Sequence, residues 1–184
     1  MQEQTKWPSH LKSRQNDTIT SAIGEVWVPR GSNTEIVCKR LIQDWKHHKG
    51  HVFVYGDATG GAQGTAKVRG SDWDLVKQHL YPVFGDRLHF KVKKANPRER
   101  QRINAVNSRL LSVKGITHFQ VDAKHCPNII RDFEGTQILE GSAGEIDKKT
   151  DPERSHITDG IGYYVHHEYP ILKMAAPNQK HWKN

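Results

Sequence analysis

Several common features are missing from this chain of 184 residues, and each absence excludes a class of protein. No apolar run approaches the ~20 residues that a transmembrane helix needs, and the sequence predicts neither a membrane span nor a secretory leader. The only two cysteines, Cys38 and Cys126, stand far apart without a C-x-x-C pair, which indicates reduced, buried thiols in a cytosolic protein. Neither G-x-x-x-x-G-K-[ST] nor a G-x-G-x-x-G following a strand occurs, so the sequence favours neither a P-loop motor nor a Rossmann-type enzyme.

The composition is that of one globular domain with a positive charge. Hydrophobic residues make up 35% and charged residues 26%, which is typical of a folded chain rather than of a low-complexity one. The length suffices for one domain with a real core. A net charge of +8 favours polyanionic partners, nucleic acid among them.

The stretch from His51 to Gly61 contains the first candidate site. Its apolar, β-branched and aromatic run at 52–55 is too short for a helix and is bounded by glycines, which predicts a buried central strand with both faces covered. Asp57 follows this strand, and a glycine-rich segment follows Asp57. α/β folds place ligands at such strand ends, and glycines let a bulky partner approach the backbone. The alternative, in which Asp57 only closes an Asp-x-x-Gly turn, fits this segment equally well.

Strands alternate with helices along the rest of the chain, which predicts the α/β class. Strands are expected at 19–28, 52–55, 88–94 and 116–121, and helices at 34–48, 72–80, 97–111, 125 or 128 to 133, and 155–169, with tails at 1–20 and 171–184 and a loop at 135–154. Ser32 or Asn33 is expected to cap the first helix and Ser71 the second, which Pro82 should end. Basic side chains, those of Arg98, Arg100, Arg102 and Arg109, are expected on the exposed surface of the third helix.

The last expected helix, 155–169, carries the second candidate acid. Its apolar stripe consists of Ile157, Ile161, Tyr164 and Val165. Asp159 lies on the opposite side, and Gly160 and Gly162 each cost about 1 kcal/mol relative to alanine inside a helix. Such glycines indicate that another element packs close to the backbone. An exposed helix acid is the simpler interpretation of Asp159 when this helix is judged alone.

Together, Asp57 and Asp159 suggest a metal site. Mg²⁺ is often held by one or two carboxylates, with phosphate and water completing its shell. Two such ions roughly 4 Å apart can activate a water molecule and stabilise the leaving oxygen in phosphodiester cleavage. The hypothesis requires that a strand end and a late helix converge.

At these residues the chain resembles the C-terminal nuclease domain of phage terminase large subunits, the DNA-packaging motors of tailed phages. Tyr-Gly-Asp-Ala-Thr-Gly at 55–60 is similar to the family's strand motif. Ser-His-Ile-Thr-Asp-Gly-Ile-Gly-Tyr at 155–163 is similar to the family's final helix motif. In the family, the aspartate of each motif binds metal. Segments 102–107 and 121–134 also resemble the family, and the order agrees over roughly 21–170, the expected nuclease domain.

The resemblance implies an RNase H-like mixed sheet flanked by helices. It also implies Mg²⁺- or Mn²⁺-dependent endonucleolytic cleavage of concatemeric double-stranded DNA, with two ions and with Asp57 and Asp159 as catalytic metal ligands. The implied partners are the terminase ATPase domain, the small terminase subunit and the portal, in the cytoplasm of a bacterial host and without a membrane. The side chains expected to contact DNA are those of Lys67, Arg69, Arg98, Arg100, Arg102 and His156; a solvated helix face is the alternative for the arginines.

The chain departs from the family pattern at its start. Such nuclease domains begin with a strand that carries the first metal-binding aspartate, and no apolar strand ending in Asp precedes 19–28. Asp17 lies in a polar stretch, and Glu25 is interpreted as structural or exposed. The fold is therefore expected to be incomplete at its N-terminal strand, as the distal part of a large terminase. The alternative function is a catalytically impaired fragment that only binds DNA or packaging partners.

Overall fold

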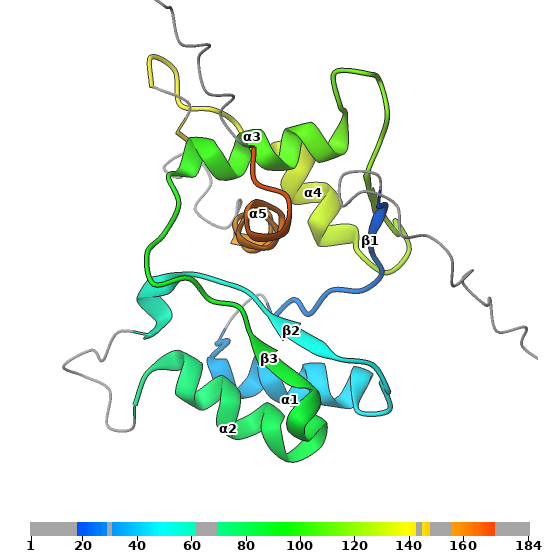
Figure 1. Cartoon of the computed structure of the whole chain (residues 1–184), viewed down its shortest axis with the longest axis vertical. Helices are drawn as coiled ribbons and strands as arrows, with labels where there is room; N and C mark the ends of the chain where they lie inside the picture. The colour runs from blue at the N-terminus through cyan, green and yellow to red at the C-terminus, as the bar shows by residue number, and fades with distance from the viewer. Residues whose placement is uncertain (1–17, 29–30, 62–69, 143–144, 148–155, 172–184) are drawn as a thin grey trace, which may run out of the picture.

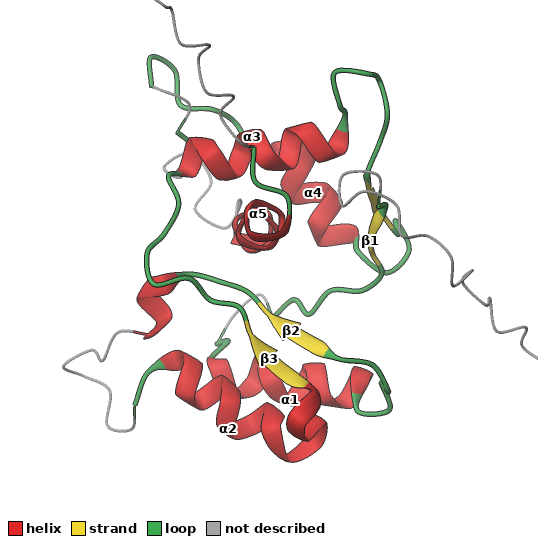
Figure 2. Cartoon of the chain, viewed as in Figure 1, coloured by secondary structure: helices red, strands yellow, loops and turns green. Residues whose placement is uncertain are grey.

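The computed structural model describes residues 18–28, 31–61, 70–142, 145–147 and 156–171 (Figure 1). Its elements are β1 (Thr20–Ala22), α1 (Thr34–Trp45), β2 (Val52–Val54), α2 (Asp72–Phe84), β3 (Leu88–Phe90), α3 (Glu99–Leu110), β4 (Phe119–Val121), α4 (Pro127–Gly135) and α5 (His156–Glu168), with short 3-10 helices at Ala58–Gly61 and Gly85–Arg87. The class is α/β, as expected (Figure 2). Within the described ranges, no helix combines the length and hydropathy needed to cross a bilayer.

The first layer consists of β2 and β3, which pair in parallel, with α1 and α2 against them (Figure 1). Its buried cluster is formed by Cys38, Leu80 and Phe84, and Val52 and Leu88 pack against that cluster from the strands. Burial of these apolar side chains attaches both helices to the same face of the strand pair.

Local capping fixes where the two helices begin. The side chain of Asn33 accepts a hydrogen bond of 2.8 Å from the N–H of Ile36. Ser71 and Asp74 form a reciprocal capping box at the start of α2. Both helix starts were expected from the sequence, because the caps are encoded within a few residues.

The end of α2 corrects the expectation that Pro82 terminates it. The helix runs on to Phe84 with the proline inside its last turn. Proline removes one N–H donor, but Leu80 and Phe84 lie one turn apart and are both buried, so their packing holds that turn in place. Gly85 then leaves the helix with φ of 56°.

The second layer consists of β1 and β4, also parallel, with α3, α4 and α5. In Figure 1 α5 is seen end-on while α3 runs across the view. The buried cluster here contains Ala105, Val106, Phe119 and Val165. It therefore joins α3, β4 and α5, which are distant in sequence.

The N-termini of α4 and α5 are each fixed by an acidic side chain from outside that helix. Glu25 accepts hydrogen bonds from the backbone N–H groups of Asn128 and Ile129, at 2.9 and 2.8 Å. The buried Asp132 accepts one of 2.9 Å from the N–H of Thr158. Carboxylates suit helix N-termini because of the unpaired N–H groups there. Of the two interpretations of Glu25, structural or exposed, the contacts support the structural one.

Several strand predictions differ from the structure. The expected strand at 19–28 is regular only over Thr20–Ala22, and the strands form two separate pairs instead of one mixed sheet. The prediction that 52–55 is a buried central strand is wrong: among the described residues β2 has a neighbour on one side only, and Phe53 is 46% exposed. In the expected loop, Ile138 and Ile146 form an antiparallel bridge. The expected tails lie largely outside the described residues.

The glycines after β2 accommodate an indole ring. A Cβ on Gly56 would lie 2.4 Å from Cη2 of Trp73, and one on Gly60 would lie 2.8 Å from its Nε1. The same Nε1 donates a hydrogen bond of 2.9 Å to the backbone oxygen of Asp57, so the ring is held against this turn. The close approach predicted for this loop is thus made by Trp73.

Gly56→Ala and Gly160→Ala should change stability in opposite directions. The first would force a methyl group into the fixed indole of Trp73 and should lower the free energy of unfolding by about 1–3 kcal/mol. A Cβ on Gly160 meets nothing within 4 Å, so alanine there should raise it by about 0.5–1 kcal/mol. Urea denaturation of both variants measures the difference. Equal stability of the two variants would contradict the packing around Gly56.

Candidate functional site

Asp57 lies just beyond the carboxyl end of β2 and is held by neighbouring donors. Its Oδ1 accepts hydrogen bonds from the N–H of Thr59 at 2.6 Å and from Nδ2 of Asn96 at 2.7 Å. The N–H of Gly60 donates to its backbone oxygen at 3.3 Å. Asp57 therefore does close a turn. The turn also fixes the orientation of its carboxylate.

The environment of Asp57 favours its charged form. Partial burial opposes ionisation, but the hydrogen bonds from Thr59 and Asn96 and the positive charge of Arg102 outweigh it and hold the pKa of Asp57 below its ordinary value. The carboxylate is consequently ionised throughout the neutral range.

Asp159, which is half-buried on α5, forms an ion pair with the buried Arg102 on α3. Nη2 of Arg102 lies 2.9 Å from Oδ1 of Asp159, and the two side chains are 8% and 24% exposed. The ring of Tyr163 lies 4.3 Å from the guanidinium carbon. A Cβ on Gly162 would lie 3.2 Å from Cβ of Arg102, which accounts for this glycine: α3 packs directly on it.

Two of the four arginines at the start of α3 and within it are not where the sequence placed them. Arg102 and Arg109 are buried, whereas Arg98 and Arg100 are exposed as expected. Arg109 donates hydrogen bonds to the backbone oxygens of Thr18 and His118. The helix was expected to bury only one face, but α5 covers a second side of it.

Arg102 connects the two candidate acids. It is bonded to Asp159, and its charge contributes to the lowered pKa of Asp57. Of the two acids, only Asp159 contacts the guanidinium; the effect of Arg102 on Asp57 is the smallest of the causes that lower the pKa of that carboxyl. In the part of the chain that the structure describes, no group of three or more His, Cys, Asp or Glu side chains could hold a metal ion.

Basic and imidazole groups lie beside Asp57. A small cavity is lined by the glycine that precedes Asp57, Gly56, and by Lys93, Asn96 and His166. Burial, together with the charges of Lys93, Arg102 and His167, lowers the pKa of His166 below its ordinary value, so its imidazole is neutral at pH 7.

The ion pair also borders a cavity with largely apolar walls. This cavity has a volume of about 190 Å³, and Val106, Phe133 and Ile146 line it together with Arg102 and Asp159. Apolar surroundings strengthen the attraction between the paired charges and make it costly to separate them.

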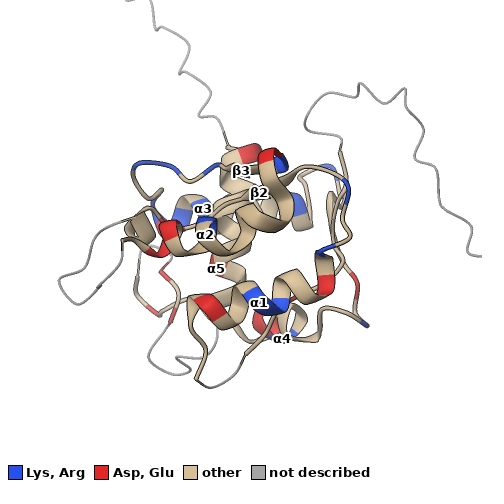
Figure 3. Ribbon diagram, turned by 90° about the horizontal axis from the view of Figure 1, so that it is seen from below, with Lys and Arg blue, Asp and Glu red and all other residues tan. Residues whose placement is uncertain are grey.

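The remaining predicted contacts do not gather at one place. His156 is exposed at the start of α5 and borders a different hollow, with Trp27. Lys67 and Arg69 lie outside the described residues. α1 carries both signs of charge, in the i,i+4 pairs Glu35–Lys39 and Arg40–Asp44 (Figure 3).

Sequence reasoning missed Asn96 and His166. Asn96 follows β3, the parallel neighbour of β2, and the carboxyl ends of parallel neighbours meet at one edge of a sheet. That rule could have identified Asn96, had the pairing of the two strands been known. His166 lies two turns after Asp159 on α5; helical spacing placed it on the same side as Asp159, but nothing in the sequence gave it a role.

The ion pair makes a specific prediction for a double-mutant cycle. Arg102→Met should lower the free energy of unfolding by about 1–3 kcal/mol, because it removes the guanidinium that is hydrogen-bonded to the half-buried carboxylate of Asp159. Combined with Asp159→Asn, the loss should be smaller than the sum of the single losses by about 1–3 kcal/mol. Urea denaturation measures all of these values. Arg100→Met, at an exposed position on the same helix, is the control and should stay within about 0.5 kcal/mol of the parent.

The lowered pKa of Asp57 predicts a pH-dependent contribution to stability. A group with a depressed pKa stabilises the fold above its unfolded pKa, about 3.9 for aspartate, and loses this contribution as the pH falls through its folded pKa. Asp57→Asn should therefore be less stable than the parent at pH 6, and the difference should shrink below about pH 3.9. Urea denaturation at pH 6 and at about pH 3 tests this. A difference that does not change with pH would contradict the assignment.

The candidate site therefore consists of Asp57 with its donors and of the Arg102–Asp159 pair, supplied by the end of β2, by α3 and by α5.

Comparisons with protein-family models, with curated proteins and with solved structures each find no match for this chain.

Proposed function

We propose that this chain is a metal-dependent DNA endonuclease domain of the kind found in phage terminase large subunits, with an RNase H-like arrangement of its elements. The observation that carries the proposal is the position of Arg102, which is paired with Asp159 while its charge acts on Asp57. The buried guanidinium already compensates the negative charge of Asp159, the charge that a divalent cation bound there would compensate. The proposal makes the two acids parts of one site.

The donor set fits a hard divalent cation. Carboxylate oxygens are the ligands that Mg²⁺ and Mn²⁺ take, and one or two of them suffice when substrate phosphate and water complete the shell. Asp57 and Asp159 would hold the ion or ion pair. Bound there, the metal would polarise a phosphate and lower the pKa of a water molecule.

The other residues of the site would hold and neutralise the substrate. Asn96 and Thr59 fix the carboxylate of Asp57, so its orientation is set before DNA arrives. Arg102 is the natural partner for a phosphate oxygen once a cation occupies Asp159, because a guanidinium binds either oxyanion in the same geometry. Neutral His166 can accept a proton near the cavity beside Asp57.

The basic run after β3 would contact the DNA backbone. Lys93, Arg98 and Arg100 are exposed and follow the same strand end as Asn96. Contacts to phosphate position a duplex without reading its sequence. As part of a packaging motor, the domain would work in the bacterial cytoplasm with an ATPase domain, a small subunit and a portal.

A second function is favoured by a different observation. Asp159 is already neutralised by a buried arginine, and the described residues supply no third ligand near it. A chain of this kind would bind DNA or packaging partners without cutting. Salt-sensitive DNA binding without cleavage would identify this second function.

A plasmid-nicking assay separates the two functions. The parent should convert supercoiled plasmid to the nicked form when Mg²⁺ or Mn²⁺ is added, and chelation by EDTA should stop the reaction. Asp57→Asn should lower the nicking rate by at least about a hundredfold, because the change removes a metal ligand and keeps the shape of the side chain. Asp159→Asn should do the same, with its thermal melt recorded because the ion pair is lost.

Asp122→Asn is the matched control. Asp122 is an exposed acid after β4, paired with His125 outside the candidate site, so its variant should cut like the parent. Parental nicking rates in both site variants would refute the site. Absence of cleavage at every metal concentration, with DNA binding retained, would leave the second function.

A further inference from the structure

A large groove runs between the two layers, and strand residues from both layers line it. Its volume is about 800 Å³, and its walls include all three residues of β1 and, from the β2 segment, Phe53 and Tyr55. α5 contributes the floor through Gly160, Ile161 and Tyr164. The groove therefore has a strand of each parallel pair on its sides.

Both strands present unpaired main-chain groups to this groove. In a parallel ladder, alternate residues of a strand direct their N–H and C=O groups to the same neighbour. The N–H of Thr20 bonds to His118, which assigns Thr20 and Ala22 to the β4 side and leaves Ser21 facing away. The N–H of Lys91 bonds to the oxygen of Val54, which in the same way leaves the main chain of Phe53 facing away from β3.

Within the described ranges, no main-chain hydrogen bond to another element is recorded for either outward-facing residue. Among the residues that the structure describes, no other element pairs with the main chain of Ser21 or Phe53, and both residues are exposed and line the groove. Unpaired strand edges are templates for another strand. Two-stranded sheets are also marginal on their own, and a third strand stabilises them.

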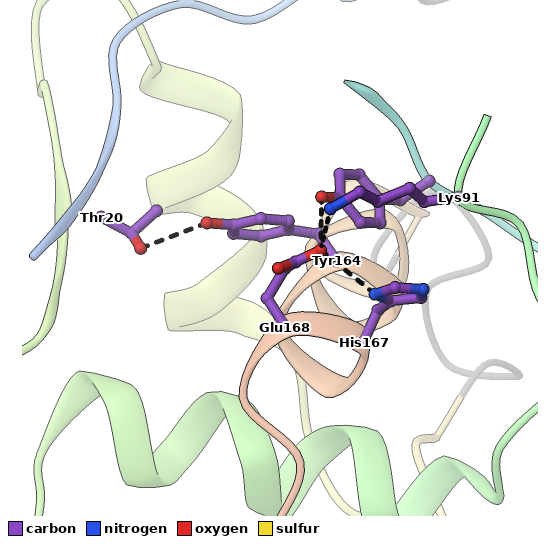
Figure 4. A network of polar contacts seen from close by, with 6 residues as sticks. Thr20, Lys91, Tyr164, His167 and Glu168 are labelled. Carbon is purple, nitrogen blue, oxygen red and sulfur yellow. Dashed lines mark hydrogen bonds and ion pairs between the residues drawn. The ribbon is translucent and has the colours of Figure 1, made fainter. Parts of the chain in front are cut away.

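The surface of the groove is suited to an apolar, uncharged ligand. Phe53 is 46% exposed and Ile23 is 58% exposed. The polar groups in the groove satisfy one another: Glu168 accepts bonds from Lys91 at 2.8 Å and from the Tyr55 hydroxyl at 2.7 Å (Figure 4).

The polar groups at the floor of the groove are also hydrogen-bonded to each other. The Tyr164 hydroxyl is hydrogen-bonded to the Thr20 hydroxyl at 3.3 Å, so this ring spans from α5 to β1 (Figure 4). Gly160 leaves open space at the floor of the groove, because a Cβ on this residue would meet no atom within 4 Å. With its charges already paired, the groove offers apolar side chains and main-chain hydrogen bonds, which are the groups that an extended peptide matches.

We propose that this groove is a docking site for an extended segment of another polypeptide, which adds as a β-strand to the free edge of β2 and rests against β1. Apolar side chains at alternate positions of the segment would cover Phe53 and Ile23, and its main chain would bond to Phe53 and Ser21. The proposal goes beyond nuclease activity and does not depend on it, because no ligand of the proposed metal site takes part. It does have a consequence for that site: a strand added to β2 would end beside the turn of Asp57.

Amide hydrogen exchange of the full chain tests the docking site. The probe is a capped seven-residue peptide of alternating threonine and valine. Strand addition works through the main chain, so any strand-forming sequence of this kind should bind. The Phe53 and Ser21 amides should exchange quickly in the chain alone and about tenfold more slowly at a peptide concentration of about ten times Kd. The same peptide with N-methyl groups on its pairing edge should give no slowing.

Substitutions at Gly160 supply the matched control. Gly160→Leu places a side chain into the open space of the groove and should abolish the slowing, whereas Gly160→Ala should keep it; thermal melts confirm that both variants are folded. Slow exchange of the Phe53 amide in the chain alone would overturn the proposal, because the edge would then be occupied already. No slowing at either amide up to millimolar peptide would overturn it as well. Neither result bears on plasmid nicking, so failure here is distinguishable from failure of the proposed function.

Discussion

The ion pair between the buried Arg102 and Asp159 is the interaction on which the second layer and the candidate site both depend. α3 and α5 approach closely because Gly162 has no side chain, and the guanidinium is then enclosed by α5 and the ring of Tyr163. A charge enclosed in this way needs its partner, since removing one member of a buried pair costs far more than the pair itself contributes. If a cation bound Asp159, Arg102 would keep Glu99, whose Oε1 lies 3.9 Å from its Nη2, and would be open to a further anionic partner. A phosphate group of DNA is such a partner, and this couples metal binding to substrate binding in the proposed nuclease.

The helices were the most predictable part of the fold, and the reason is local. Asn33 and Ser71 specify helix starts within three residues of themselves, so no distant contact is needed to recognise them. Pro82 shows where local reasoning fails, because the packing of Leu80 and Phe84 keeps a turn that the proline alone would end. The α3 arginines fail for a related reason. Helical periodicity identifies one buried face, and it cannot reveal that a second helix covers another side.

The candidate site was predictable only in part, for a similar physical reason. Asp57 could be found because a strand, an acid and glycines follow one another in sequence. Asn96 lies beside it only because β2 pairs with β3, and Arg102 meets Asp159 only because α3 packs on α5. These are non-local pairings, and the residues involved carry no distinctive pattern. The role of the glycines after β2 could not be predicted either, because the indole that fills the space beside Gly56 comes from another helix.

The apolar run at 52–55 connects the fold to the groove. Such a run is typical of a strand with neighbours on both sides, yet β2 has one neighbour among the described residues and exposes Phe53. The composition of this segment thus suits a more complete sheet than the pair it forms. Asp57 follows directly, and the precision of a site depends on the rigidity of the element that carries it. A three-residue strand with one hydrogen-bonded edge is a weak support for the carboxylate that the proposed function uses. A strand on its other edge would stiffen the chain immediately before the turn, so the proposed docking would also favour order at Asp57.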